Sequence, residues 1–247
     1  MGKFVELQKY DIVKYEALTD KPFAKILSLE NKLKFYRFQF VGPVRASETF
    51  YDTPNDILYK AGIVLSRIQE DDRVFFKVEQ VSSLKSKTQK VFSHKVGVKD
   101  TIKDHSFYLV DGIRAMFSTP IYIDLENVIK NAVPKISISI MANVYKIISG
   151  SGFRAYMCLE TQKYENFETK RQHKSDGMTI KLDGPTQYLP EFNSFNDNIK
   201  KYCKEFIEVN DNVYEHAKKL TKKVDTKQIK LDKKKAKEKI ANFKNGE

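Results

Sequence analysis

The stretch FYDTPNDILYKAGIVLSRI, from Phe50 to Ile68, interrupts a strand-like pattern with a brief helical signal. Thr53 can cap a helix through its side-chain oxygen, and Pro54 suits the first helical position, where a missing N–H costs nothing. Gly62 can adopt a positive φ and end the helix. The residues therefore predict a strand, about two turns of helix over 54–61, and a second strand. From the local chemistry alone, such a connector fits any α/β or α+β domain.

Alternating apolar and polar residues predict strands along most of the remaining chain, and helical spacing predicts the segments between them. We expect the VGP sequence at 41–43 to form a turn, and the apolar stripe over 195–220 to form one core-facing helix. About eight antiparallel strands bracketed by helices suit a closed or nearly closed barrel. The clearest strand segments are KLKFYRFQF (32–40), RVFFKVEQ (73–80), KTQKVFSHKV (87–96), KISISIM (135–141) and MTIKLD (178–183).

The basic charge of the chain is concentrated at its C-terminal end. Of the formal net charge of +12 over 247 residues, the segment 218–247 holds +8, because it contains twelve Lys against four acidic residues. The body of the chain is therefore nearly balanced, and the overall charge says little about a binding site there.

Composition excludes several classes of protein. Cys158 and Cys203 lie far apart, and the four His residues are scattered, so the sequence predicts neither a disulfide framework nor a zinc site. No Ser–His or Cys–His pair stands at catalytic spacing. The start of the sequence lacks the apolar core of a signal peptide, and no run approaches the length of a membrane span. We expect a soluble, cytoplasmic protein with no membrane contact.

The segment Tyr51–Leu65 resembles the core signature of the CYTH family, the triphosphate tunnel enzymes. The family's typical form reads Tyr-(Tyr/Phe)-Asp-Thr-Pro, a short helix, then Gly-Ile-x-Leu-Arg-x-Arg. YDIVKYE (Tyr10–Glu16) stands where the family places Glu-x-Glu-x-Lys on its first strand. The resemblance implies an α+β fold, a CYTH-like antiparallel β-barrel of about eight strands with flanking helices around a triphosphate tunnel. We expect this barrel domain over residues 1–220, with its C-terminal core helix, and a flexible Lys-rich tail over 221–247.

The resemblance also implies where a phosphate ligand would bind. In the family, inward Arg and Lys side chains hold the triphosphate by charge and hydrogen bonds. Lys14 falls on the family's first-strand Lys, whereas Arg67 falls one residue off the family's Arg-x-Arg, which points it to the other sheet face unless a bulge intervenes. Each candidate cation also fits the solvated face of a half-buried strand. The phosphate-binding candidates are Lys14, Arg67, Arg73, Lys77, Lys146, Arg154 and Lys181.

The acidic half of the family's site is missing from this sequence. Paired Glu residues on the first and later strands of the family hold Mg²⁺ or Mn²⁺, which bridges phosphate oxygens and activates water. Tyr10 and Ile12 occupy the first two carboxylate positions here, and neither can bind a metal. The remaining metal candidates are Glu160 and Asp183, with Glu79 as a further carboxylate. Glu160 and Asp183 fit surface positions better than metal-ligand positions. No catalytic residue is assigned.

We therefore expect a divergent CYTH-like protein that binds a triphosphate-containing or polyphosphate ligand in a basic tunnel. Its metal-dependent phosphohydrolase activity is expected to be weak or lost. If active, it would be a triphosphatase or a related nucleotidyl cyclase that uses Mg²⁺ or Mn²⁺. The alternative is a non-enzymatic interaction protein that reuses the barrel, with the basic tail contacting nucleic acid or an acidic partner.

Overall fold

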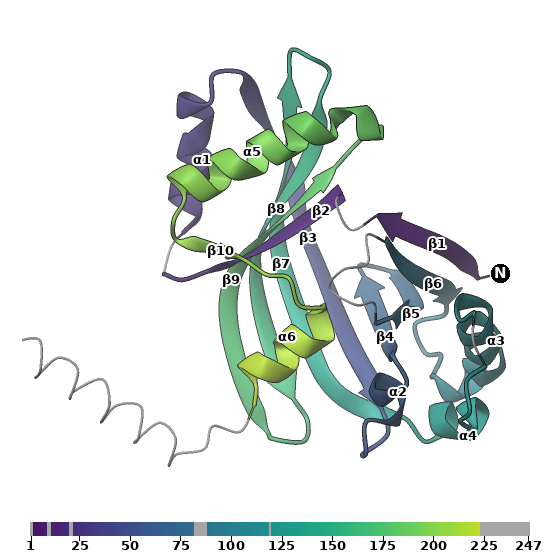
Figure 1. Cartoon of the computed structure of the whole chain (residues 1–247). Helices are drawn as coiled ribbons and strands as arrows, with labels where there is room; N and C mark the ends of the chain where they lie inside the picture. Colours follow the sequence, from purple (N-terminus) through teal and green to yellow (C-terminus); the bar gives the residue numbers. More distant parts are fainter. Residues whose placement is uncertain (1, 9–10, 20–21, 82–87, 119, 223–247) are drawn as a thin grey trace, which may run out of the picture.

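An antiparallel sheet of ten strands forms the centre of the described chain, in the order β1-β6-β5-β4-β3-β7-β8-β9-β2-β10 (Figure 1). The computed structural model describes residues 2–8, 11–19, 22–81, 88–118 and 120–222. The strands are β1 (Lys3–Gln8), β2 (Ile12–Ala17), β3 (Tyr36–Asp52), β4 (Ile63–Glu70), β5 (Arg73–Gln80), β6 (Thr88–Val96), β7 (Val133–Ser149), β8 (Arg154–Asn166), β9 (Arg171–Leu182) and β10 (Phe206–Glu208).

The N-terminal segment brings the two ends of this strand order together. β1 pairs with β6 at one end of the sheet, and β2 pairs with β9 and β10 at the other end. Only four residue steps separate Gln8 in β1 from Ile12 in β2, and four steps span at most about 14 Å. The sheet therefore curls into a nearly closed barrel, although no pairing between described residues joins its two end strands. The predicted antiparallel barrel with flanking helices is confirmed in this form.

Helices cover the outer face of the sheet in two groups (Figure 1). α1 (Phe23–Lys32) and α5 (Leu189–Tyr202) pack on β2, β7, β8 and β9, and α3 (Ser106–Met116) and α4 (Leu125–Lys130) pack on β4, β5 and β6. Burial of each large apolar side chain in these cores stabilises the fold by about 1.5–3 kcal/mol. The outer face is thus occupied by hydrophobic packing, and polar chemistry is left to the inner face. Fully buried side chains of the two outer cores include Met157, Ile180, Phe192, Phe195, Phe76, Val78, Leu109 and Ile113.

One end of the inner face is closed by α6 (Val213–Leu220), which lies across the sheet away from α1 and α5 (Figure 1). Tyr214 packs against Phe50 with ring centroids 5.2 Å apart. On the same helix, Lys218 forms an ion pair of 2.8 Å with Asp56, which also pairs with the buried Lys135 at 3.1 Å. Apolar packing and a charged network therefore hold α6 in place.

The Asp-Thr-Pro stretch positions a shorter helix than the sequence predicts. α2 (Ile57–Lys60) begins three residues after Pro54, so the predicted helix start is wrong. The physical reason is that Asp52, which is 1% exposed, caps the helix from the end of β3 together with Thr53, whose Oγ1 accepts the backbone N–H of Ile57 at 3.1 Å, as its capping chemistry predicts. Its carboxylate accepts backbone N–H groups of Thr53, Leu58 and Tyr59 at 2.7, 2.9 and 2.9 Å.

Two residues around α2 adopt a positive φ. Asp56 immediately before the helix has a φ of 55°, which breaks the run of helical residues that the sequence predicts. Gly62 has a φ of 77° at the start of β4, as predicted for the residue that ends the helix. Strand, short helix and second strand thus occur in the predicted order.

The predicted VGP turn is wrong, because β3 runs through it as a single strand of 17 residues. The register with β7 shifts between Phe40 and Gly42, where Gly42 has a φ of 152°. A bulge at a glycine accommodates the extra residue and bends the strand without ending it.

The predicted single helix over 195–220 is also wrong. α5 ends at Tyr202, β10 then pairs with β2, and Asn212 starts α6 by accepting the backbone N–H of Glu215 at 2.8 Å. The side chain of Asn212 provides a new N-cap, so a second helix starts after the break. Residues 223–247 of the predicted tail lie outside the described residues. No helix in the described part of the chain is long and apolar enough to cross a membrane.

Candidate functional site

Strand register brings six of the seven predicted cations to the inner face. Residues opposite one another in an antiparallel pair share a face, and so do residues two apart along one strand. Lys146 lies opposite Tyr156, which lies opposite Lys181 on β9, which in turn lies opposite Ile12 on β2. By the same rule the cations that share the inner face are Lys14, Arg73, Lys77, Lys146, Arg154 and Lys181.

Three of these cations form an arc across neighbouring strands, which we call the cationic arc: Lys14 on β2, Lys181 on β9 and Lys146 on β7. Lys14 lies opposite Thr179, two residues from Lys181, so these lysines are diagonal neighbours. The Nζ of Lys146 lies 5.8 Å from the ring centre of Tyr156 and 3.9 Å from Asp183 Oδ2. Within the described residues, neither Lys14 nor Lys181 has a hydrogen bond or an ion pair from its side chain. The arc therefore carries positive charge that is only partly neutralised.

A buried ion triad lies on the same face, deeper in the barrel. The Nζ of Lys77 is 2.7 Å from Glu48 Oε1 and 2.9 Å from Glu79 Oε1, and all three side chains are at most 17% exposed. Ser66 also donates a hydrogen bond of 2.7 Å to Glu48 Oε1. Burial opposes the charged forms, yet the two carboxylates raise the pKa of Lys77 above its ordinary value.

The pKa of Glu48 reflects charges on neighbouring strands and on β2. Burial would raise this pKa, but Lys77 and Ser66 hold it below its ordinary value, with a further contribution from Lys14. Lys14 is on β2 and Glu48 is on β3, which are far apart in the strand order. The curl of the sheet therefore brings the cationic arc within electrostatic range of the triad.

A third polar group fills the inner face beside α6. Gln162 donates a hydrogen bond to Glu160 and accepts one from Tyr164. His216 of α6 lies 3.5 Å from Glu16 of β2. Burial, with Glu16 and Glu160 adding to it, raises the pKa of Tyr164 to about 12, so this hydroxyl stays protonated as a donor.

With Lys77 in place between Glu48 and Glu79, the carboxylates of the inner face do not fit a divalent metal ion. Such an ion needs several oxygen ligands that converge on one point, and no group of three or more His, Cys, Asp or Glu side chains in the described residues is arranged to hold one. The backbone N–H of Asp183 donates a hydrogen bond to the carbonyl of Arg154. Arg154 lies six residues along β8 from Glu160, so the two metal candidates are about 20 Å apart. The structure does not bring them together. Glu79 is already paired with Lys77.

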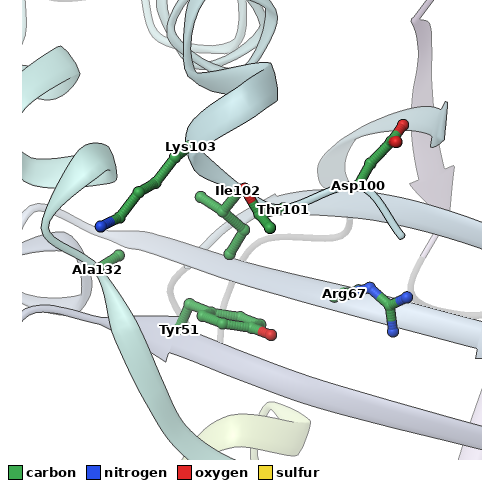
Figure 2. A pocket seen from close by; sticks show the side chains of 7 residues that line it. All are labelled: Tyr51, Arg67, Asp100, Thr101, Ile102, Lys103 and Ala132. Carbon is green, nitrogen blue, oxygen red and sulfur yellow. The ribbon is translucent and has the colours of Figure 1, made fainter. Parts of the chain in front are cut away.

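Arg67 is the predicted cation that the structure places elsewhere. It lies opposite Phe76 and Thr49 with no bulge, and therefore points to the outer face. Its guanidinium donates a hydrogen bond of 2.7 Å to the Val98 carbonyl. Arg67 lines a pocket of about 460 Å³, and Figure 2 shows Tyr51 and Lys103 among the other residues that line it. Arg67 cannot join the inner-face cations from this position.

Two other predicted cations lie at the rim of the inner face. Arg73 is exposed at the β4–β5 turn and pairs with Glu70 at 3.3 Å. Arg154 is exposed at the start of β8, and its side chain has no hydrogen bond or ion pair within the described residues. Arg154 is thus available at the mouth near Lys146 and Lys181, whereas Arg73 is partly neutralised.

Sequence reasoning missed Glu48, Ser66 and the pairing of Lys77. Glu48 lies two residues from Phe50 on β3 and therefore shares its face. The pattern along one strand does not reveal which strand lies across the barrel. Ser66 stands where the family pattern has the first Arg of Arg-x-Arg, and this substitution signals a changed environment. A small hydroxyl in place of a long cation leaves room for the triad.

The comparisons with known proteins give likenesses at the level of fold. No family model and no curated protein matches the sequence. A putative adenylate cyclase from Bacillus halodurans is 9% identical over 82% of this chain and 95% of that chain, with a TM-score of 0.46. A putative adenylyl cyclase from Hippeastrum, described as having a dominant triphosphatase activity, is 12% identical over 84% and 93%, with a TM-score of 0.47. An RNA triphosphatase from S. pombe is 8% identical over 77% and 70%, with a TM-score of 0.32.

The fold of this chain is the curled antiparallel sheet with flanking helices that the resemblance of the Tyr51–Leu65 stretch predicts. An antiparallel sheet curls around a charged inner face, helices pack on its outside, and α6 closes one end.

Proposed function

We propose that the inner face binds a triphosphate-containing or polyphosphate ligand through the cationic arc, and that metal-dependent hydrolysis of this ligand is weak or absent. The observation that carries the proposal is the position of Lys14 and Lys181, which are diagonal neighbours on one face without an ion-pair partner in the described residues. Lys146 and Arg154 extend the same positive region toward the mouth of the barrel.

The electrostatics favour an extended anion over a single carboxylate. Like charges on neighbouring strands repel one another, and a polyanion that lies along them removes this repulsion. Each ammonium–phosphate hydrogen bond is charge-assisted and contributes about 1.5–3 kcal/mol. Two such bonds from Lys14 and Lys181, with support from Lys146, are enough for specific binding of a chain of phosphates.

Catalysis would require more than this binding surface. Hydrolysis of a phosphoanhydride needs stabilisation of the developing charge and an activated water, which a bound divalent ion supplies in metal-dependent enzymes. Glu48 and Glu79 are held by Lys77, and Glu160 is bonded to Gln162. The acidic groups of the inner face are thus engaged with protein partners.

The test is equilibrium binding of tripolyphosphate by the full chain and by charge-removing variants. Lys14→Ala and Lys181→Ala should each weaken binding by about tenfold or more, which corresponds to the loss of one charge-assisted hydrogen bond. Lys163→Ala is the matched control, because Lys163 is exposed on β8 and points to the outer face opposite Lys174. Equal weakening by all three variants would indicate nonspecific attraction and would refute the site.

Phosphate release by the same preparations tests the second half of the proposal. We expect negligible release from tripolyphosphate with Mg²⁺ or Mn²⁺ added. Rapid metal-dependent turnover that is lost in Lys14→Ala would establish an enzyme and contradict this half.

A further inference from the structure

The ammonium group of Lys77 occupies the position between two carboxylates where a divalent cation would be held. It lies 2.7 Å from Glu48 Oε1 and 2.9 Å from Glu79 Oε1, on the inner face of the barrel. Hard divalent cations in proteins are bound by carboxylate oxygens that converge in this way. In this chain the cation between the two carboxylates is the side chain of Lys77.

The strand neighbours of Lys77 and Glu79 on β4 and β6 are uncharged. Lys77 lies opposite Ser66 on β4 and Ser93 on β6, and Glu79 lies opposite Val64 and Val91. Ser66 donates to the same Glu48 oxygen that Lys77 contacts. The strand neighbours thus offer hydroxyl groups and aliphatic walls, and they place no further cation against Glu79.

The net charge of the triad also matters for a ligand nearby. One ammonium and two carboxylates leave a charge of −1, which Lys14 on the facing strand partly compensates through its effect on Glu48. A divalent ion in place of the ammonium would make the group neutral. The Lys77 arrangement therefore positions the carboxylates without making a metal centre.

We propose that Lys77 is a built-in replacement for a divalent cation, so that ligand binding on the inner face does not require metal, and that its removal uncovers a latent Mn²⁺ or Mg²⁺ site between Glu48 and Glu79. The part of this inference that concerns the ligand rests on the proposed function. The part that concerns the latent site stands on the geometry of the triad alone.

Binding of Mn²⁺ by Lys77→Met, measured by electron paramagnetic resonance, tests the latent site. Methionine reaches as far as the Lys Cε and lacks the ammonium group, so the two carboxylates are left to share a cation. We expect one tightly bound Mn²⁺ in this variant, none in the native chain, and a melting temperature of the variant that rises on addition of Mn²⁺. The matched control is the triple variant Lys77→Met with Glu48→Gln and Glu79→Gln, which has the same size but no carboxylates and should bind no Mn²⁺.

Several results would overturn the inference. One is that a folded Lys77→Met chain does not bind Mn²⁺. Another is that Mn²⁺ binding persists in the triple variant. If Lys77→Met folds only when Mn²⁺ is present, the inference is supported. If it stays unfolded with Mn²⁺ while the triple variant folds, the site cannot accept a metal and the inference fails.

A second measurement separates this inference from the proposed function. Tripolyphosphate should bind the native chain in EDTA, and added Mg²⁺, which itself forms a complex with tripolyphosphate, should not be required for binding. Binding that appears only with Mg²⁺ would contradict the role of Lys77 and leave the phosphate site intact. Absence of binding in both conditions would refute the proposed function, and the Mn²⁺ result for Lys77→Met would still decide the latent site.

Discussion

Replacement of Asp52 by alanine should destabilise the protein more than the loss of an ordinary helix cap. The buried carboxylate accepts three backbone N–H groups at 2.7–2.9 Å, from Thr53, Leu58 and Tyr59. A hydrogen bond to a charged group contributes about 1.5–3 kcal/mol, and the three bonds share one acceptor group, so their contributions do not simply add. We expect a loss of about 3–5 kcal/mol in the free energy of unfolding, because the variant leaves three donors without their acceptor in a buried turn.

Urea denaturation followed by circular dichroism measures this loss. Asp124→Ala is the matched control: Asp124 caps α4 at an exposed position with a single bond of 3.2 Å to the backbone N–H of Asn127. Its loss should cost about 1 kcal/mol. If Asp52→Ala costs no more than Asp124→Ala, Asp52 does not organise the connector and the explanation of the Asp-Thr-Pro stretch is wrong.

Three further predictions concern the core, acid stability and the tail. Phe195→Ala should cost about 3–5 kcal/mol in urea unfolding, because Phe195 is fully buried and packs edge-on against Tyr36 at 5.0 Å; a cost below about 1 kcal/mol would contradict the outer core. Burial, reinforced by His105, lowers the pKa of His94, which faces His105 at 3.2 Å, while Asp100 bonds to His105 at 2.9 Å. The unfolded chain therefore takes up a proton at His94 at a higher pH than the folded chain, and the free energy of unfolding should fall as the pH drops below about 6.5. His94→Phe should flatten this dependence of stability on pH. An unchanged dependence would assign the effect to other groups. Truncation after Lys222 removes nine Lys and four acidic residues and should weaken salt-sensitive retention on immobilised nucleic acid with little change in melting temperature; retention equal to that of the full chain would rule out the basic tail as its source.

The fold was accessible from sequence where local chemistry and periodicity agree. The Tyr51–Leu65 stretch predicted strand, helix and strand in order. The misplaced start of α2 has a physical reason. Thr53 and Asp52 both cap the helix, and the positive φ of Asp56 places its start at Ile57, three residues later than the capping residue Thr53 and Pro54 alone predict.

The long-range features were not predictable in the same way. The break between α5 and α6 follows from the pairing of Phe206 with Ala17, nearly 190 residues apart, which helical spacing does not encode. The VGP sequence has turn chemistry, yet continuous pairing with β7 overrides it.

The candidate site shows the same division between local and long-range information. Period two along a strand and regular pairing across strands place Lys146, Lys181 and Lys14 on one face, but the sequence indicates only that each lies on a predicted strand. The neutralisation of Lys77 by Glu48 and Glu79 depends on three strands meeting at one point. This contact can be recognised only from the three-dimensional structure, because no single strand carries a sequence pattern that predicts it.

A crystal structure of the full chain with tripolyphosphate would test the central claim most directly. The account predicts phosphate oxygens within hydrogen-bond distance of the Lys14 and Lys181 ammonium groups, with Lys77 still held between Glu48 and Glu79. A triphosphate bound instead in the outer pocket beside Arg67 and Lys103 would contradict it.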